Sequence, residues 1–225
     1  MGTRAFVWLG GALFAGSLSL CAWSFLFVMG RSLPHAGWQP LAVDAALITS
    51  FALHHSVFAR ERVKQWLSRS VPAPLLRSLY VWIASVLLML VSFLWQPIGG
   101  SLYAAAGLLA LALACVQLTG LFITSRSVAR IDPLELAGIR PATQAQGLQR
   151  SGPYQWVRHP LYLGWVLMVF GTAHMTGDRL AFAAITSVYL VVAIPWEERS
   201  LRRSFGEDYT RYMRDVPWRM IPFIY

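Results

Sequence analysis

The sequence predicts an all-α fold, a polytopic integral membrane helical bundle of about six transmembrane helices that ends in a C-terminal helical hairpin. Of its 225 residues, 56% are hydrophobic and 13% are charged, which is about half the charged fraction of a typical soluble domain. The mean hydropathy is +0.52. The uncharged runs are also long, because no charged residue occurs from position 78 to position 125.

Six segments approach the length of about 20 apolar residues that a membrane-crossing helix needs. In chain order they are Ala5–Met29, Leu41–Phe58, Leu79–Trp95, Leu102–Thr124, Leu161–Thr176 and Leu180–Trp196. The first is too long for the apolar core of a signal peptide, so we interpret it as a retained span. Turn-forming residues at 96–101 predict a tight hairpin between the third and fourth spans. The short polar turn at 174–179 predicts a second hairpin, formed by the last two spans.

The basic residues predict the orientation of these spans. Six spans place both termini and the loops at 59–78 and 125–160 on one side, which carries 17 Lys and Arg residues. The other side carries only Arg31 and Arg179. Because loops rich in Lys and Arg stay in the cytoplasm, we expect cytoplasmic termini in a bacterial inner membrane. Loop retention also explains the net charge of +9, and we expect no nucleic-acid partner.

The antiparallel hairpin of the last two spans predicts a cluster of ionisable residues at its cytoplasmic mouth. Arg158 and His159 precede the fifth span, and Glu197 and Glu198 follow the sixth. Pro160 suits the first turn of a helix, which would leave Arg158 and His159 beside free backbone N–H groups that can cradle an anion. Two acids at a helix C-terminus oppose the helix dipole, so a compensating partner is expected.

A second interpretation of the same residues is structural. Arg158 would then be a simple membrane anchor, and the two glutamates would form a solvated patch. The cations available to pair with that patch are Arg199, Arg202 and Arg203.

The other spans contain a few polar and cysteine residues. Asp44 lies in the first turn of the second span, where the helix dipole favours a structural role. His54 and His55 lie at the cytoplasmic end of that span, and His55 is the better functional candidate, although a packing role is open. Cys21 and Cys115 lie inside apolar runs and predict neither a disulfide framework nor a metal site.

Motifs in the last third of the chain come in an order and spacing that resemble a known superfamily. They are Gly152-Pro153-Tyr154, Arg158-His159-Pro160-Leu161-Tyr162-Leu163-Gly164, Glu197-Glu198-Arg199, Phe205-Gly206, Tyr209, Tyr212 and Val216-Pro217. This pattern resembles the C-terminal signature of the isoprenylcysteine carboxyl methyltransferase and phospholipid methyltransferase superfamily. The tail Trp218-Arg219-Met220-Ile221-Pro222 is similar to its carboxyl methyltransferase branch.

The first half of the chain resembles the NnrU-like proteins and, more closely, the bacterial methanethiol S-methyltransferases. The residues that carry this similarity are His55-Ser56-Val57-Phe58-Ala59-Arg60, Val71-Pro72, Arg77-Ser78-Leu79-Tyr80-Val81 and Phe93-Leu94-Trp95-Gln96-Pro97. The resemblance implies two parts, NnrU-like membrane helices at 1–130 and a cofactor-binding hairpin with a cytoplasmic tail at 131–225.

The resemblance implies a methyltransferase that uses S-adenosylmethionine. The implied cofactor-binding residues are Tyr154, His159, Tyr162, Leu163, Gly164, Glu197 and Glu198, of which the two glutamates would hold the methionyl portion. Arg158 or free backbone N–H groups would bind the donor's carboxylate. His55 or Arg60 would lie at the acceptor side, where a thiol must lose its proton because the thiolate is the nucleophile.

The methyl acceptor is expected to be apolar or lipid-like, because it can enter from the surrounding membrane lipids. A small thiol such as methanethiol is the preferred candidate, with an isoprenylcysteine carboxylate or a phospholipid amine as alternatives. A more distant alternative is a haem-binding NnrU-like isomerase or redox accessory protein, with His54, His55 and His174 as candidate ligands. A sterol reductase that uses NADPH and a non-catalytic scaffold are the remaining alternatives, and the oligomeric state is open.

Overall fold

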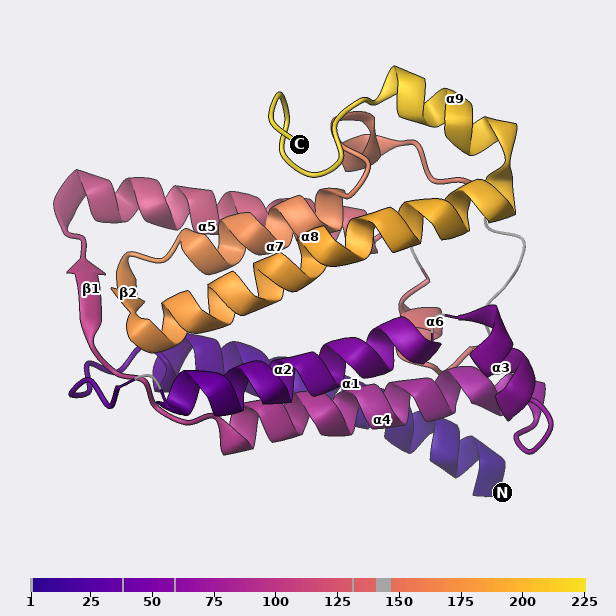
Figure 1. The fold of residues 1–225 in the computed structure, drawn as a ribbon, viewed down its shortest axis with the longest axis horizontal. Helices are drawn as coiled ribbons and strands as arrows, with labels where there is room; N and C mark the ends of the chain where they lie inside the picture. Colours follow the sequence, from indigo (N-terminus) through magenta and orange to yellow (C-terminus); the bar gives the residue numbers. More distant parts are fainter. Residues whose placement is uncertain (1, 38, 59, 131, 141–146) are drawn as a thin grey trace. The chain divides into compact units, whose positions relative to one another are not determined.

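The computed structural model describes residues 2–37, 39–58, 60–130, 132–140 and 147–225, and these residues are mostly helical (Figure 1). The first half contains α1 (Gly2–Trp23), the π-helical turn η1 (Ser24–Val28), α2 (Gln39–Phe58), α3 (Glu61–Leu67), α4 (Ala73–Leu94), β1 (Ser101–Ala104) and α5 (Gly107–Val128). The second half contains α6 (Pro133–Leu136), the 3₁₀ turn η2 (Gly152–Gln155), α7 (Pro160–Phe170), β2 (His174–Thr176), α8 (Gly177–Phe205) and α9 (Glu207–Asp215). β1 and β2 pair in a two-stranded sheet.

The predicted fold class is confirmed. Among the described residues, five helices are long and apolar enough to cross a membrane, namely Gly2–Val28, Gln39–Phe58, Leu75–Leu94, Gly107–Val128 and Gly177–Phe205. Large apolar side chains stay exposed on them, for example Phe93 on α4 and Leu108 on α5, as expected of helices that face lipid rather than water. The protein is therefore an integral membrane protein.

Several predicted boundaries differ from the observed elements. α7 contains 11 residues and measures about 16 Å at 1.5 Å per residue, because it ends at Phe170 and the chain then pairs with β1 through β2. α8 continues past the predicted end at Trp196 to Phe205, with Pro195 inside the helix. The chain between α4 and α5 contains a strand instead of only the tight turn predicted at 96–101.

The described chain forms two compact units that each combine separate segments. Unit 1 contains Met1–Leu102, Asp132–Thr143 and Thr176–Phe182, and unit 2 contains Tyr103–Ile131, Gln144–Met175 and Ala183–Tyr225. In unit 1, α4 packs along α1 and α2. In unit 2, α5 packs along α7.

Buried carboxylates hold together the turn that follows α4 in unit 1. Asp178 accepts hydrogen bonds from Trp95 Nε1 at 2.8 Å and from the backbone N–H groups of Ile98 and Gly99 at 2.9 Å. Asp44 accepts one from the backbone N–H of Gln96 at 2.8 Å. These bonds satisfy backbone donors that are not paired in a helix or sheet, which supports the structural interpretation of Asp44.

Glycines allow α5 and α7 to approach closely in unit 2. A Cβ atom on Gly164 would lie 2.3 Å from Thr124 Oγ1 and 2.8 Å from the carbonyl oxygen of Gly120. A Cβ atom on Gly120 would lie 2.5 Å from the backbone nitrogen of Met168. Small residues at such positions let helix backbones pack against each other in a membrane.

We expect Gly164→Ala to destabilise unit 2, because the new methyl group would push α7 away from α5. Overpacking of this kind costs about 1–3 kcal/mol of unfolding free energy, which a thermal or denaturant melt in detergent measures. Gly16→Ala is the matched control, because Gly16 is also helical and its Cβ would meet nothing within 4 Å. Equal melts for the two variants would contradict tight packing at Gly164.

Candidate active site

Arg158 lies in the non-helical segment before α7, and its guanidinium is buried. Its Nε donates a hydrogen bond to Glu198 Oε1 at 2.7 Å, and its Nη1 donates to the carbonyl oxygens of Val216 at 2.8 Å and Pro217 at 2.7 Å. The Arg158 and Glu198 side chains are only 4% and 3% exposed. Each charge therefore depends on the other for compensation. Arg158 joins the start of α7 to α8 and to the segment after α9.

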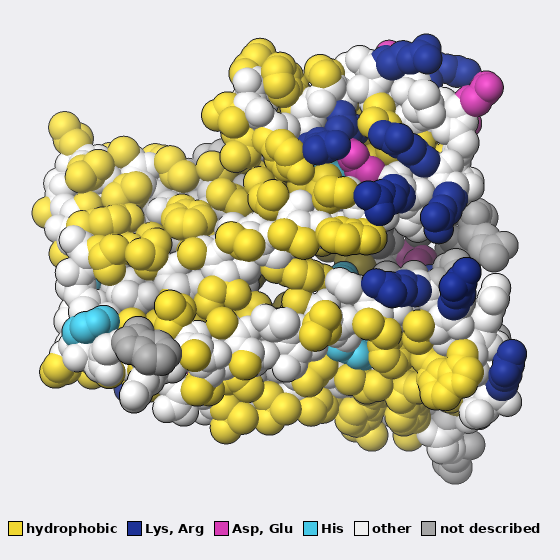
Figure 2. All heavy atoms as spheres, in the orientation of Figure 1, with side chains coloured by type: hydrophobic (Ala, Val, Ile, Leu, Met, Phe, Trp, Pro, Cys, Tyr) yellow, Lys and Arg dark blue, Asp and Glu magenta, His cyan; other side chains and the backbone are white. Residues whose placement is uncertain are grey.

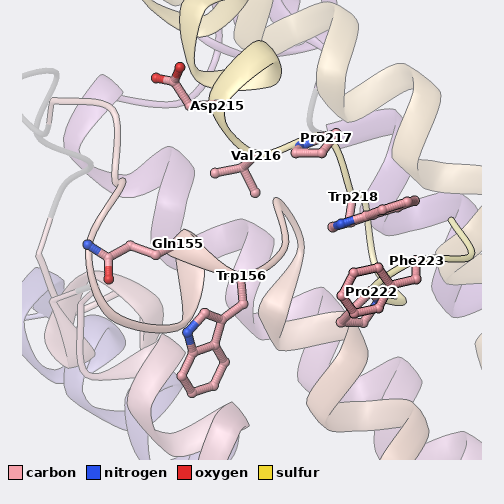
Figure 3. A pocket seen from close by; sticks show the side chains of 8 residues that line it. All are labelled: Gln155, Trp156, Asp215, Val216, Pro217, Trp218, Pro222 and Phe223. Carbon is pink, nitrogen blue, oxygen red and sulfur yellow. The ribbon is translucent and has the colours of Figure 1, made fainter.

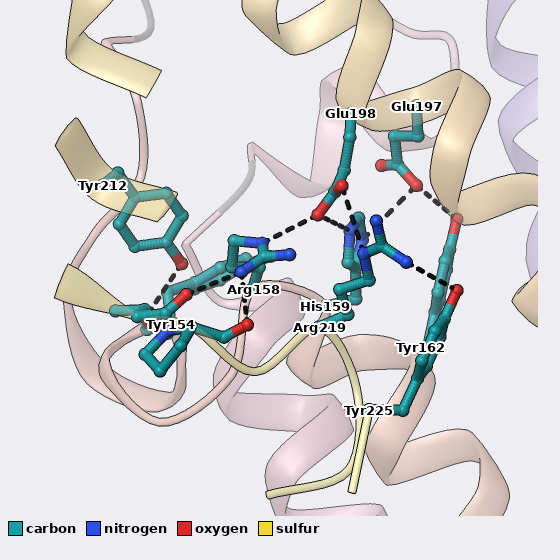
Figure 4. Close-up of polar contacts among 11 residues, drawn as sticks. Tyr154, Arg158, His159, Tyr162, Glu197, Glu198, Tyr212, Arg219 and Tyr225 are labelled. Atoms are coloured by element: carbon teal, nitrogen blue, oxygen red, sulfur yellow. Dashed lines mark hydrogen bonds and ion pairs between the residues drawn. The ribbon is translucent and has the colours of Figure 1, made fainter. Parts of the chain in front are cut away.

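Glu197 takes a different environment from its neighbour Glu198, because its side chain is 45% exposed. Its Oε2 accepts a hydrogen bond from the Tyr162 hydroxyl at 2.7 Å and lies 3.5 Å from His159 Nδ1. The His159 ring stacks on the Tyr162 ring with centroids 5.3 Å apart. Figure 4 shows these side chains converging from α7 and α8. Glu197 therefore keeps acceptor capacity on a surface that a ligand can reach.

Tyr154 extends this cluster from η2. Burial raises the pKa of the Tyr154 hydroxyl above its usual range, and the nearby Glu197 carboxylate raises it further. The backbone carbonyl of Tyr154 accepts a hydrogen bond from the Tyr212 hydroxyl at 2.7 Å. Tyr212 packs with Tyr209 and Val216 in a small buried core that fixes α9. Burial, and then the Glu198 carboxylate, raise the pKa of Tyr209.

The segment after α9 completes the cluster, and a turn at Gly206 sets the direction of α9. Gly206 has φ +54° and ψ −123°, a conformation that favours glycine, and it separates α8 from α9. The backbone N–H groups of Arg158 and His159 donate to the carbonyl oxygens of Trp218 at 2.9 Å and Arg219 at 2.7 Å. Arg219 Nε lies 3.3 Å from Glu198 Oε2. An open hollow of about 390 Å³ borders Arg158, Arg219 and Tyr225.

Two details of the predicted cluster were wrong, although Pro160 does begin α7 as expected. The N–H groups of Arg158 and His159 are not free to cradle an anion, because carbonyls of the tail accept both. Glu197 and Glu198 do not lie at a helix C-terminus, because α8 continues to Phe205. The charge of Glu198 is compensated by Arg158 and Arg219, whereas Glu197 contacts the Tyr162 hydroxyl and His159. The structure favours neither the solvated patch nor the simple anchor for Arg158 and Glu198.

Leu163 and Gly164 follow Tyr162 on α7. Leu163 is half-buried, whereas Gly164 is buried and faces α5 through the close approach to Thr124 and Gly120. The described contacts therefore give Gly164 a packing role. Sequence reasoning did not include Arg219 and Tyr225 among the site residues, although the tail motif around Trp218 was a usable signal.

His55 and Arg60 belong to unit 1, and the other predicted site residues belong to unit 2. His55 Nδ1 shares a hydrogen bond with the Tyr80 hydroxyl. His54 stacks on the Tyr80 ring at 5.3 Å, with its Nε2 3.3 Å from the Tyr80 carbonyl oxygen. Arg60 is exposed and precedes α3. Tyr80 thus orients both histidines from α4.

The sequence is similar to several known methyltransferases. Residues 109–208 match the phospholipid methyltransferase family. The methanethiol S-methyltransferase of Crocosphaera subtropica is 39% identical over 193 residues, which cover 82% of this chain and 75% of the relative. The methanethiol S-methyltransferase of Mycobacterium tuberculosis is 35% identical over 211 residues, 85% of each chain.

A shorter similarity reaches a second group of enzymes. Protein-S-isoprenylcysteine O-methyltransferase B of Arabidopsis thaliana is 35% identical over 80 residues, 34% of this chain and 40% of the relative. No solved structure matches the chain. Similarity that extends over most of both chains at this identity is sufficient to assign the family. The chain is therefore a methyltransferase that belongs to the membrane family containing the methanethiol S-methyltransferases.

Proposed function

We propose that the protein transfers a methyl group from S-adenosylmethionine to a small thiol such as methanethiol. The observation that carries this proposal is the similarity to relatives named for that acceptor, which covers 82% of the chain in one case and 85% in another. The similarity to the Arabidopsis isoprenylcysteine O-methyltransferase covers only 34% of the chain. An isoprenylcysteine carboxylate is therefore the second candidate acceptor.

The cluster in unit 2 suits the groups that S-adenosylmethionine carries. The donor's ammonium needs a carboxylate that a ligand can reach, and Glu197 offers one at 45% exposure. His159 Nε2 lies 3.6 Å from Glu198 Oε1 and makes no hydrogen bond among the described residues, so its hydrogen-bonding capacity is left for a ligand group. Tyr154, Tyr162 and Leu163 supply apolar walls. We assign donor binding to the part at 131–225 and the acceptor side to the part at 1–130.

Glu198 and Arg158 have a positioning role in this proposal, unlike Glu197, which contacts the donor's ammonium. Their ion pair is buried and Arg158 also holds two carbonyls of the tail. We assign both to the positioning of the donor site, with Arg158 near enough to the tail hollow to attract the donor's carboxylate. A charged pair fixed in this way keeps its geometry without reorganising when a ligand binds.

The chemistry asks the chain mainly for positioning. When bound, S-adenosylmethionine supplies a methyl group on a cationic sulfur that leaves as a neutral thioether. The residues of unit 2 hold the donor, and a dry environment excludes water from competing with the acceptor. His55 takes the proton from the thiol sulfur, with Tyr80 holding the imidazole, and Arg60 favours the resulting thiolate by its charge.

The proposal is tested by a methyl-transfer assay with labelled donor and three acceptors in parallel. Methanethiol, a prenylcysteine analogue and phosphatidylethanolamine represent the three acceptor chemistries. We expect label in dimethyl sulfide alone. Label in the prenylcysteine ester alone would identify the isoprenylcysteine carboxylate as the acceptor in place of the small thiol. No label with any of the three acceptors would overturn the proposal.

We expect Glu197→Gln to weaken donor binding, because the neutral amide cannot pair with the ammonium. A hydrogen bond to a charged group contributes about 1.5–3 kcal/mol, which corresponds to a loss of affinity of roughly 10- to 150-fold. Calorimetry with S-adenosylhomocysteine, which keeps the ammonium, measures the change. Glu207→Gln on α9 is the control for loss of an acid elsewhere in unit 2, and equal affinities for the two variants would exclude Glu197 from the donor site.

We further propose that the chain resides in a bacterial inner membrane with both termini in the cytoplasm, where the donor is found. The excess of Lys and Arg at the ends of the spans supports this orientation. This orientation is tested by fusing to each terminus a reporter that is active only in the cytoplasm, or one that is active only in the periplasm. Activity of a periplasmic reporter at either terminus would contradict it.

A further inference from the structure

The residues Met220–Tyr225, which we call the hook, form a closed loop. The backbone N–H groups of Met220 and Ile221 both donate to the Tyr225 carbonyl oxygen, at 2.8 and 3.0 Å. In return, the N–H group of Tyr225 donates to the Ile221 carbonyl oxygen at 3.0 Å. The Arg219 guanidinium lies 5.1 Å from the Tyr225 ring centroid and donates to its hydroxyl at 3.2 Å. The hook is therefore an ordered element with a defined outer surface.

The hook presents two of its apolar side chains outward, whereas Met220 is buried. Phe223 is 84% exposed and Ile224 is 77% exposed. Phe223 also has φ +67°, a left-handed conformation that is costly for a bulky residue. In water, neither the strained backbone of Phe223 nor the exposed surface of the two apolar side chains is favourable.

The surroundings of the hook are mostly apolar, with Gln155 and Asp215 as the polar residues that line the hollow beside it. Figure 3 shows Phe223 and Pro222 beside Trp218, with Trp156 on the opposite side of an open hollow of about 420 Å³. The Trp218 and Phe223 rings lie 5.4 Å apart. Trp156 is 57% exposed. Aromatic side chains of this kind gather where a protein meets the edge of the hydrocarbon region.

Backbone hydrogen bonds tie the hook to the start of an apolar helix. Trp218 and Arg219, which precede the hook, accept bonds from Arg158 and His159, immediately before the apolar helix α7 begins at Pro160. Figure 1 shows the chain turning back after α9 toward the start of α7. The hook therefore lies beside the mouth of the spans of unit 2.

The charge near the hook complements an anionic surface. Residues 199–225 contain six arginines against three acids, Glu207, Asp208 and Asp215. On the face of unit 2 drawn in Figure 2, basic side chains gather around the end of α8 and around α9, and apolar side chains cover the flanks of the helices. Basic residues next to exposed apolar ones are typical of segments that lie in the interface of an anionic membrane.

Three observations support one proposal: Phe223 and Ile224 are exposed, the hook is attached beside the start of α7, and residues 199–225 carry excess positive charge. We propose that the hook inserts Phe223 and Ile224 into the interface of the surrounding bilayer and that arginines of residues 199–225 bind anionic lipid headgroups. The bilayer is preferred to a protein partner because the hook is attached at the level where the apolar spans end. Insertion would also anchor Trp218 and Arg219, the residues that pair with the donor cluster.

The experiment places an environment-sensitive nitrobenzoxadiazole dye on the hook of the full chain. The dye is attached to Ile224→Cys in a Cys21→Ala/Cys115→Ala background and the protein is reconstituted in nanodiscs of phosphatidylcholine, with or without phosphatidylglycerol. We expect a blue-shifted emission and quenching by lipids that carry a doxyl group near the headgroup. Quenching is expected to rise with phosphatidylglycerol and to fall with added salt, because the attraction to headgroups is screened.

The control carries the same dye at Thr210→Cys on the exposed face of α9, where we expect a more aqueous spectrum and weaker quenching by lipid than at position 224. A second variant, Phe223→Asp added to the Ile224→Cys protein, is expected to lose the lipid quenching. The inference is overturned if the dye at 224 behaves like the dye at 210 or if quenching survives Phe223→Asp. Quenching that ignores phosphatidylglycerol would overturn the assignment of the arginines to anionic headgroups. A melt in detergent checks that each variant is folded, and the readout does not depend on methyl transfer.

Discussion

Replacing Arg158 with Met is expected to lower the unfolding free energy of the protein by about 3–5 kcal/mol, the usual cost of breaking a buried ion pair by removing one partner. Glu198 would keep its charge in a site where its side chain is 3% exposed. Arg219 would remain 3.3 Å from the other carboxylate oxygen of Glu198, but its side chain is more exposed than that of Arg158. The carbonyls of Val216 and Pro217 would also lose their donor.

Denaturant melts in mixed micelles measure this effect, with Arg199→Met as the matched control. Arg199 follows the same glutamates on α8 but is exposed and lies over the Trp196 ring at 5.9 Å. The double variant Arg158→Met/Glu198→Met is expected to be more stable than Arg158→Met alone, because it leaves no unpaired buried charge. A stability of Arg158→Met equal to that of the control would show that the pair does not hold the tail.

Replacing His55 with Ala is expected to reduce kcat/KM for a thiol acceptor by about 100-fold or more at neutral pH, the usual contribution of a general base. The loss should shrink as the pH rises through the pKa of the thiol itself, because the thiolate then forms without a base. Tyr80→Phe removes the hydroxyl that contacts His55 Nδ1 and should give a smaller loss with the same pH trend. The affinity for S-adenosylhomocysteine should not change in either variant.

The control for this prediction is His35→Ala, because His35 is an exposed histidine of unit 1 outside the helices. It is expected to keep the pH profile of the unaltered protein. Full turnover of His55→Ala at saturating donor would remove His55 from the mechanism. A loss that is equal at every pH would indicate a packing role for this residue instead of proton transfer.

Local sequence signals predicted the membrane helices well and their ends less well. Hydrophobic runs identify the segments that cross a membrane, because each residue contributes separately to the transfer of the segment from water into the bilayer. The end of α7 depends on the pairing of β2 with β1, and the length of α8 depends on a helix that tolerates Pro195. A hydropathy profile contains neither the pairing with a distant strand nor the continuation of a helix through a proline.

In the candidate site, too, the sequence predicted some features and only the packing decided others, as Glu197 and Glu198 show. The predicted hairpin of the last two spans indicated that Arg158, His159, Glu197 and Glu198 would gather, and they do. Sequence did not distinguish the two glutamates. Neighbouring residues on a helix point about 100° apart, so Glu198 faces Arg158 and the tail while Glu197 faces Tyr162 and solvent. Only the packing of α8 against the segment after α9 decides which is which.

The amino-acid sequence by itself determined that this chain lies in a membrane, that it has the motifs of its methyltransferase family, and which ionisable residues meet at the end of a helical hairpin. These properties depend on composition and on short motifs whose spacing survives in any helical arrangement. The tertiary structure decided that Trp218 and Arg219 take up the amide donors of Arg158 and His159 and that Tyr80 orients His55. Such pairings join residues that are 25 to 60 positions apart, so they exist only once the helices have packed.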